Sequence, residues 1–278
     1  MNNLNINISN PQKIIYPKNK INKLDVVCYY TMVAPFMLSY IKNRPLATIR
    51  CHGTIRDEIF FKKHPQAGEK NIKTFINNND EYFYINSING IVNQAQMGTI
   101  EFHPWACTYN SLNKPNIMIF DLDPAPNVHI AQLREGVINL KQILEELNLT
   151  SFLKTSGGKG YHVVVPFSSC KNWEVFSEFS KNIAKIMEQK WPTKYTTNIR
   201  KNERDGKIFI DYLRNDKGST CVAPYSLRAR ENAPVSMPIF WDELNKIKPN
   251  QITLNLALKK IKEPNPWSLF WDVKQSIN

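Results

Sequence analysis

Apolar and polar positions alternate along the chain in two ways, one at helical spacing and one at strand spacing. Residues 24–41 have apolar side chains at helical spacing with an interruption at Pro35, and residues 129–147 and 172–191 have the spacing of amphipathic helices. The order of helical and strand-like runs predicts an α/β or α+β domain whose central sheet carries acidic residues at strand ends. The strand-like runs lie at 45–51, 58–64, 117–123, 207–213 and, on either side of a glycine-rich turn, within 151–167.

The charge of the chain narrows the class of partner. The sequence has 36 Lys and Arg residues against 24 Asp and Glu residues, which gives a formal net charge of +12 over 278 residues. An excess of this size favours polyanionic partners such as nucleic acid, because each neutralised phosphate releases a counterion. The alternative is a lysine-rich composition that serves solubility alone.

Several classes of protein do not fit the sequence. It has no run of about 18 uncharged apolar residues, so we expect no membrane span and no membrane partner. The N-terminus lacks the basic start and apolar stretch of a secretory signal. Scattered cysteines without a C-x-x-C pair predict a reducing, cytoplasmic location rather than a zinc ribbon or a disulfide framework. The cysteines are Cys28, Cys51, Cys107, Cys170 and Cys221.

Three acidic residues stand at or within the apolar runs. Asp121 and Asp123 end the run 117–123, and on a strand both would point to one face, about 6.6 Å apart along the backbone. Asp211 follows three apolar residues of another run, where a carboxylate is costly to bury unless it is paired or metal-bound. Carboxylates from two adjacent strands would suffice to hold two Mg²⁺ or Mn²⁺ ions. The alternatives are helix capping by the first two acids and a salt bridge from Asp211 to Arg214.

Residues 155–162 combine glycines with polar side chains. The glycines at 157, 158 and 160 allow a close backbone approach, while Ser156, Lys159 and His162 supply donors for an anion. The segment does not match the phosphate-loop pattern G-x-x-x-x-G-K-S/T. A tight hairpin turn between two strands would also explain the glycines, so the segment alone leaves both interpretations open.

Basic and aromatic residues elsewhere complete the candidates. His103 lies in the sequence EFHPW, and Arg228 or Arg230 could grip a triphosphate because a guanidinium binds phosphate in a bidentate fork. Phe60 and Phe61 precede two lysines and a histidine, and aromatic rings flanked by cations can stack on bases while the cations bind the backbone. Solvated surface charges and a core phenylalanine are the alternatives.

Taken together, these segments resemble the polymerase domain of DNA ligase D, which belongs to the archaeo-eukaryotic primase superfamily. The resemblance runs from about residue 10 to residue 265, nearly the whole chain. The segments occur in the order of that family: NPQKIIYPKNKINKLDVVCYY, RPLATIR, FFKKH, IEFHPW, FDLDP, TSGGKGYHVVVP, FIDYLRND, and STCVAPYSLRAR followed by APVSMPIFWDEL.

The resemblance implies an α+β, primase-like fold with central, mostly antiparallel sheets and flanking helices. It implies one domain over residues 1–278, in which residues 1–65 contact DNA and its 5′-phosphate and residues 66–278 form the catalytic core. The chain has no K-x-D-G ligase motif, and its only Asp-Gly pair, Asp205-Gly206, follows NER. We therefore expect a polymerase module that stands alone.

The implied activity is template-dependent nucleotide addition that fills gaps and extends ends in non-homologous end joining, with NTPs preferred over dNTPs. Two Mn²⁺ or Mg²⁺ ions are the implied cofactors. The implied partners are gapped or broken DNA with a 5′-phosphate, a separate ATP-dependent DNA ligase and a Ku-type protein. A primase that makes primers de novo, a metal-dependent nuclease and a non-catalytic end-binding scaffold remain alternatives.

Matching positions imply a role for each candidate residue. Asp121, Asp123 and Asp211 match the catalytic metal ligands. The residues that match nucleotide-binding positions are Ser156, Lys159, His162, His103 and Arg228. Lys13 and Lys23 match the pair that binds the 5′-phosphate across a gap, and Phe60 and Phe61 match the aromatic residues that meet the template. The chain departs from the family pattern at RCHGTIRDE and at Lys62, which bears on the grip on DNA rather than on the metal site.

Overall fold

A six-stranded sheet forms the centre of one half of the protein. The computed structural model describes residues 7–168, 171–204 and 206–277, so Cys170 and Asp205 lie outside the described residues. The strand order is β11-β12-β8-β10-β9-β15, and each neighbouring pair is antiparallel except β11 and β12. The expectation of a mostly antiparallel central sheet is therefore confirmed. The strands are β8 (Ile117–Pro124), β9 (Phe152–Thr155), β10 (Tyr161–Pro166), β11 (Tyr195–Thr196), β12 (Ile208–Asp211) and β15 (Pro238–Ile239).

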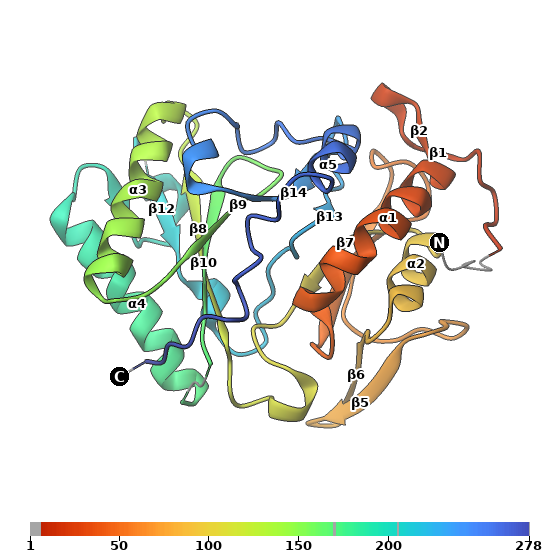
Figure 1. Cartoon of the computed structure of the whole chain (residues 1–278), viewed down its shortest axis with the longest axis horizontal. Coiled ribbons are helices and arrows are strands. Elements are labelled where there is room, and N and C mark those ends of the chain that lie inside the picture. The colour runs from red at the N-terminus through yellow and green to blue at the C-terminus, as the bar shows by residue number, and fades with distance from the viewer. Residues whose placement is uncertain (1–6, 169–170, 205, 278) are drawn as a thin grey trace.

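Two long helices pack on one face of this sheet, α3 (Ile130–Glu146) and α4 (Trp173–Lys190) (Figure 1). Both agree with the predicted segments to within one residue at each end. The side chain of Asn172 caps α4 by accepting a hydrogen bond from the backbone N–H of Val175 at 3.0 Å. The apolar stripe of α3 faces the sheet, as its helical spacing predicts. That stripe contains Leu133, Val137, Leu140 and Leu144, which are all buried.

Helix α1 (Lys23–Ile41) is the centre of the other half. It begins with a capping box. The side chain of Asn22 accepts a hydrogen bond from the backbone N–H of Asp25, and the carboxylate of Asp25 accepts one from the backbone N–H of Asn22. The helix continues through Pro35, where the sequence predicts an interruption. Buried neighbours such as Val33 and Met37 hold it against the core, which offsets the hydrogen bond that a proline cannot donate.

Among the described residues, α1 is also the one helix long and apolar enough to cross a membrane. Half of its most apolar window is buried inside the protein. Its tyrosines hydrogen-bond to core backbone, since Tyr29 Oη donates to the carbonyl of Tyr225 at 2.7 Å and Tyr30 Oη donates to that of Ile100. These contacts make α1 the core helix of this half.

Smaller sheets and a short helix surround α1. A three-stranded antiparallel sheet has the order β4-β3-β7, and two hairpins are formed by β1 with β2 and by β5 with β6. The runs 45–51 and 58–64 are confirmed as strands. The elements are β1 (Ile14–Tyr16), β2 (Ile21–Asn22), β3 (Leu46–Cys51), β4 (Ile59–Lys62), β5 (Lys73–Asn77), β6 (Asp80–Tyr84), α2 (Ile88–Gln96) and β7 (Thr99–Pro104).

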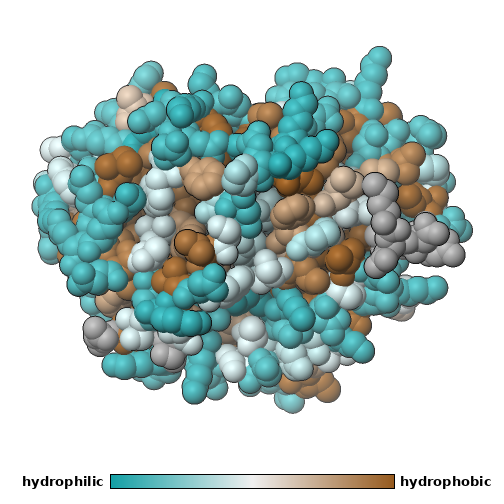
Figure 2. Space-filling view, viewed as in Figure 1, coloured by the Kyte–Doolittle hydropathy of each residue, from teal (hydrophilic) through white to brown (hydrophobic). Residues whose placement is uncertain are grey.

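The segment from 219 to 229 lies between the two halves and bonds to both. The backbone N–H of Ala223 donates to the carbonyl of Phe102 in β7 at 2.8 Å, while the N–H of Tyr225 donates to that of Ser236 at 2.7 Å. Apolar residues on the face in Figure 2 form separate patches between hydrophilic ones. The remaining elements are β13 (Ser226–Leu227), β14 (Val235–Ser236), α5 (Leu254–Lys260) and the 3₁₀ turns Pro17–Asn19, Tyr109–Ser111, Lys201–Glu203, Leu213–Asn215 and Trp241–Glu243.

Position 65, where we expect the DNA-contacting part to meet the catalytic core, lies between β4 and β5. The sheet β4-β3-β7 takes strands from both sides of this position. The division of the chain at 65 therefore stays a prediction about function, because the two parts share one sheet.

Candidate active site

Three carboxylates lie on two adjacent strands of the central sheet. Asp121 and Asp123 are on β8, and Asp211 on β12 is paired directly opposite Asp121. Side chains that stand opposite each other on antiparallel strands have Cβ atoms about 4.5–5.5 Å apart on one face of the sheet. The structure thus brings the three predicted acids together.

The pKa values of these acids depend on one another and on Arg214. Burial and the charge of Asp121 raise the pKa of Asp123. Burial also raises the pKa of Asp211, against the charge of Arg214, whose Nε lies 3.1 Å from Asp211 Oδ2. The salt bridge considered for Asp211 is therefore present. Within the described parts of the chain, no three His, Cys, Asp or Glu side chains already stand in a metal-holding arrangement.

The glycine-rich segment is the turn of the hairpin between β9 and β10, and it also lies over the acids. Ser156 Oγ accepts hydrogen bonds from the backbone N–H groups of Gly158 at 3.0 Å and Gly160 at 3.3 Å. A Cβ atom on Gly160 would lie 2.1 Å from the carbonyl oxygen of Leu122 in β8. The lack of a side chain at Gly160 therefore lets the turn pack directly on the strand that carries the acids.

His162 lies beside Asp121, because the two residues are paired across β10 and β8. Its Nε2 is 3.4 Å from Asp121 Oδ1. Burial acts to raise the pKa of Asp121, but the charges of His162 and Arg214 outweigh it and hold that pKa at about 2. The other ring nitrogen, Nδ1, lies 2.8 Å from Nζ of Lys154, a buried residue on β9 that sequence reasoning missed.

Asp121, Asp123, Ser156, Gly158 and His162 line one polar cavity with a volume of about 190 Å³. Four of its lining residues are cationic, and two predicted acids stand among them, so the cavity suits a polyanion that arrives with metal ions. It brings together His103, Asp121, Asp123, Ser156, Lys159, His162 and Arg228 of the predicted set, with Gly158, Arg214, Thr220, Cys221, Val222 and Arg230.

A buried glutamate, which sequence reasoning also missed, holds two of the nucleotide-binding candidates. Glu101 Oε2 accepts from Arg228 Nε at 2.8 Å and lies 2.9 Å from His103 Nε2, while Oε1 accepts from the backbone N–H of Ala229 at 2.7 Å. Burial acts to raise the pKa of Glu101, but His103 and Arg228 lower it to about 2. The E-x-H spacing within EFHPW was the available signal, since alternate strand residues share a face.

Replacing Glu101 by glutamine should flatten the dependence of stability on acid pH. A carboxyl whose pKa falls from 4.5 to about 2 on folding stabilises the protein above pH 4.5, and this stabilisation is lost as the pH falls through that interval. The stabilisation amounts to about 3 kcal/mol. Urea unfolding of the wild type and Glu101→Gln between pH 6 and pH 3 measures the part that is lost above pH 3, about 2 kcal/mol. Glu145→Gln, which changes an exposed carboxylate, should follow the wild type, and parallel curves for all three proteins would contradict the assignment.

The two predicted template aromatics are on β4, and Phe61 lies at the rim of this cavity beside its lining residue His103. Phe61 is 53% exposed, and its ring lies edge-on to the imidazole of His103 with centroids 6.2 Å apart. Phe60 is 38% exposed and lies 5.0 Å from the ring of His52. Exposed aromatic rings cost free energy in water, so the place of Phe61 beside the cavity fits a surface that bases would cover.

The predicted phosphate-binding lysines lie together near the N-terminus and outside the cavity. Lys13 Nζ donates to the carbonyl of His52, and Lys23 Nζ donates to the carbonyl and hydroxyl of Ser9 at 2.8 and 3.1 Å. Burial and the charge of Lys13 lower the pKa of Lys23. Two like charges held close together favour an anion between them. His52 therefore contacts candidates of both kinds, because its carbonyl accepts from Lys13 and its ring lies against Phe60.

Comparison with known proteins places the chain in a family. The family described as LigD, primase-polymerase domain, matches residues 22–267. The multifunctional non-homologous end joining protein LigD of Pseudomonas aeruginosa is 33% identical, and the match covers 98% of this chain and 34% of that protein. The bifunctional non-homologous end joining protein LigD of Bacillus subtilis is 28% identical over 90% of this chain and 41% of that protein. The chain thus spans less than half the length of these curated relatives.

A solved structure gives the same result for the fold. The polymerase domain from Mycobacterium tuberculosis ligase D, in complex with DNA, matches with a TM-score of 0.88 and 26% identity over 97% of this chain and 99% of that one. The expected α+β, primase-like fold is confirmed. Sequence and fold agree, and the chain belongs to the LigD primase-polymerase domain family of DNA-directed nucleotidyltransferases.

Proposed function

We propose that this protein is a template-directed polymerase that fills gaps and extends broken DNA ends in non-homologous end joining, with a preference for ribonucleoside triphosphates. The observation that supports this proposal is the place of Asp121, Asp123 and Asp211 on one face of the sheet, beside a cavity with four cationic side chains. A bound triphosphate needs both the carboxylates and the cationic side chains, because its metal ions bind carboxylates and its oxygens bind cations.

The donor set fits Mn²⁺ or Mg²⁺. Asp121, Asp123 and Asp211 offer only hard oxygen ligands, and their mutual repulsion favours a cation among them. When two such ions are bound, they supply Lewis-acid chemistry that activates a 3′-hydroxyl and neutralises the triphosphate.

The side chains of the cavity would bind and orient the nucleotide. Ser156, His162 and Arg228 lie along its wall, and Lys159 adds a flexible cation from the hairpin turn. They would hold the triphosphate so that the primer 3′-oxygen attacks the α-phosphorus in line and pyrophosphate leaves. Positioning and charge neutralisation account for most of the catalysis in phosphoryl transfer.

DNA would reach this cavity along the N-terminal half. The DNA in the solved relative and the net charge of +12 both favour a DNA partner. Phe60 and Phe61 would meet the template next to the nucleotide, and the lysine pair would bind the 5′-phosphate beyond the gap. We further propose a cytoplasmic, nucleoid-associated location. An ATP-dependent DNA ligase would seal the product, and a Ku-type protein would hold the ends.

A gap-filling assay tests the proposal. Labelled primer on gapped DNA is incubated with Mn²⁺ or Mg²⁺ and with NTPs or dNTPs, and we expect templated elongation that is fastest with Mn²⁺ and NTPs. Products that become shorter would indicate the nuclease. Synthesis on an unprimed template would indicate the primase, and binding without any reaction would indicate the scaffold.

Replacing both Lys13 and Lys23 by alanine should remove the preference for a 5′-phosphorylated gap. The variant should bind 5′-phosphate and 5′-hydroxyl gaps equally, and the slope of log affinity against log salt should flatten by about two charges. Fluorescence anisotropy with both gaps at several salt concentrations measures the effect.

A charge-matched control separates this site from a general loss of charge. Lys246→Ala with Lys259→Ala removes two exposed lysines in the C-terminal part and should keep the preference for the phosphate. The assignment fails if the wild type binds the two gaps with equal affinity.

A further inference from the structure

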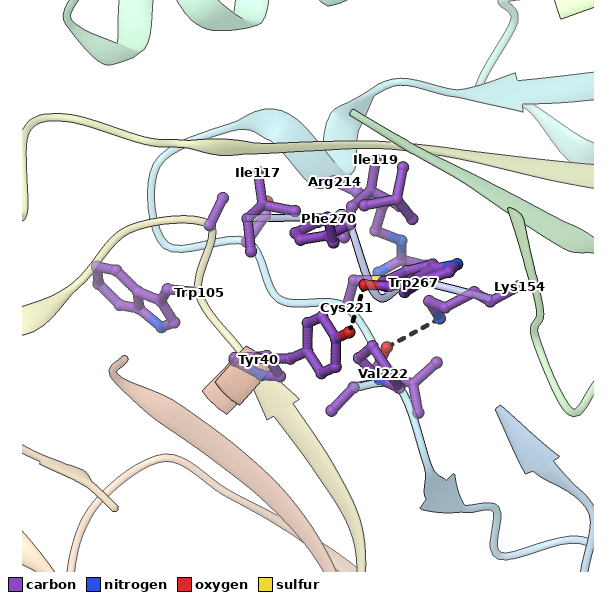
Figure 3. Close-up of a pocket in the computed structure, with 16 residues that line it drawn as sticks. Tyr40, Trp105, Ile117, Ile119, Lys154, Arg214, Cys221, Val222, Trp267 and Phe270 are labelled. Carbon is purple, nitrogen blue, oxygen red and sulfur yellow. Dashed lines mark hydrogen bonds between the residues drawn. The ribbon is translucent and has the colours of Figure 1, made fainter. Parts of the chain in front are cut away.

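Inside the protein, the nucleotide cavity adjoins a second, smaller cavity, and the two share Arg214, Cys221 and Val222 in their walls. Figure 3 shows the aromatic side chains that line the second cavity, among them the buried Tyr40 and Trp267. Its volume of about 30 Å³ holds about two water molecules and is far too small for a nucleotide. DNA that reaches the nucleotide cavity must therefore lie along the outer surface of the protein.

One surface loop joins the parts of this surface that the proposed function assigns to DNA. Residues 52–58 connect β3 to β4 and lie within RCHGTIRDE, the segment in which the chain departs from the family pattern. The carbonyl of the first loop residue, His52, accepts a hydrogen bond from Lys13, a candidate for binding the 5′-phosphate. The strand that follows the loop carries Phe60 and Phe61. Gapped DNA that contacts the lysine pair, the aromatic rings and the nucleotide cavity must cross this loop.

Hydrogen bonds within the loop brace its backbone. The backbone N–H of Thr54 donates to Asp57 Oδ2 at 2.6 Å, and the N–H of Asp57 donates to the carbonyl of Thr54 at 3.1 Å. A Cβ atom on Gly53 would lie 2.1 Å from Asp57 Oδ2, so the turn depends on this glycine. The N–H of Ile55 donates to the carbonyl of Ile15 in β1 at 2.9 Å. A braced loop can hold a DNA-contacting side chain in place at little further cost in entropy.

Arg56 is the one Lys or Arg residue of this loop. Its side chain is 60% exposed, and its Nε lies 2.8 Å from Oε1 of Glu231. Glu231 directly follows Arg230, which lines the nucleotide cavity. The salt bridge therefore holds the guanidinium between the loop and the wall of that cavity. It is made by Nε, and a guanidinium has two further nitrogens that can donate to a phosphate at the same time.

We propose that Arg56 binds one backbone phosphate of the template strand within the gap, between the templating base and the base opposite the 5′-phosphate. Glu231 orients the guanidinium for this contact. The template strand is the ligand because Phe60 and Phe61, the candidates that meet the template, follow the loop directly. Arginine suits this role, since its planar fork binds a phosphodiester through two hydrogen bonds. The proposal rests on the proposed function for the path of the DNA.

Neutralising single phosphates of the template strand locates this contact. Each phosphate across the gap is replaced in turn by an uncharged methylphosphonate, and fluorescence anisotropy gives the Kd of the wild type and of Arg56→Ala. For the wild type we expect one position within the gap at which neutralisation weakens binding about tenfold. Arg56→Ala should bind unmodified DNA about tenfold more weakly and should lose nothing further at that position. Unchanged affinity of this variant, or losses that add at every position, would overturn the proposal.

Lys190→Ala is the matched control. Lys190 also forms an exposed salt bridge between two segments, with its Nζ 3.0 Å from Oε2 of Glu146 on α3. A Cβ atom on Gly136 of α3 would lie 3.4 Å from Leu122 Cδ2, and in β8 the side chain of Leu122 points away from the face that carries Asp121. The control is therefore remote from the proposed DNA path and should match the wild type at every phosphate. A weakening as large as that in the test variant would overturn the proposal.

Primer extension separates this role from a part in the chemistry. Arg56→Ala should lower kcat/KM for gapped DNA about tenfold, chiefly through a higher KM, because the contact is made equally in the ground state and the transition state. A fall in kcat with an unchanged KM would place Arg56 in the reaction itself and overturn the proposal. If the wild type binds gapped DNA but extends no primer, the proposed function fails, while the phosphate scan still decides the role of Arg56.

Discussion

Asp121→Ala should abolish nucleotide addition while the protein still folds and binds gapped DNA. Asp121 faces Asp211 across the strand pair and lies beside Asp123, so its loss removes a shared carboxylate from the proposed two-metal site. We expect the rate of primer extension to fall at least about 10³-fold. Affinity for DNA should stay the same or rise slightly, because one negative charge is removed from the cavity. Single-turnover extension and anisotropy measure the two quantities.

The matched control is Asp242→Ala, which removes an exposed carboxylate 4.0 Å from Lys246. It should extend primers at the wild-type rate. Extension by Asp121→Ala at a rate near that of this control would contradict the assignment of the acids. A similar loss of DNA binding and extension would instead point to a folding defect, which circular dichroism would reveal.

Gly160→Ala should have the largest effect on structure. The new Cβ would lie 2.1 Å from the carbonyl oxygen of Leu122 and 3.3 Å from Asp121 Oδ1, so either the hairpin turn or β8 must move. We expect a loss of about 3 kcal/mol in the free energy of unfolding, the upper part of the range for overpacked sites, and no detectable extension. Urea denaturation and the gap-filling assay measure these effects.

Gly158→Ala is the control in the same turn. Its Cβ would lie 3.3 Å from Ser156 Oγ and 3.6 Å from Arg230 Cζ, both on side chains that can shift. This variant should stay folded and keep measurable activity. Equal stability of the two alanine variants would show that the turn does not rest on β8 in the way described.

The strongly periodic parts of the fold could be predicted from the sequence. Helices α3 and α4 have apolar stripes that only helical spacing produces, and strands β3, β4, β8 and β12 are short apolar runs with clear ends. The hairpin of β5 and β6 escaped prediction because exposed polar residues interrupt its apolar positions, so neither strand is a clear apolar run. Its turn at Asn78 and Asn79, both with positive φ, was the signal available.

In the candidate site, too, only some of the residues could be placed from the sequence. Asp121 and Asp123 could be placed on one face because a strand fixes the direction of alternate side chains. The strand pairing that sets Asp211 opposite Asp121 joins residues 90 positions apart, and no local pattern specifies it. Glu101 and Lys154 escaped notice for the same reason, since their contacts with Arg228 and Val222 cross between distant segments. The metal ions, the DNA contacts and the roles of single residues stay predictions.

The segment 219–229 limits how the molecule can change shape. Its backbone bonds to Phe102 on one side and to Ser236 on the other, and Tyr16, Tyr29 and Tyr30 of the N-terminal half attach to it as well. A hinge that swings two rigid bodies apart would break many of these bonds at once. Substrate entry would therefore rely on rotating side chains and short turns at the cavity mouth. Heat should melt both halves in a single cooperative event.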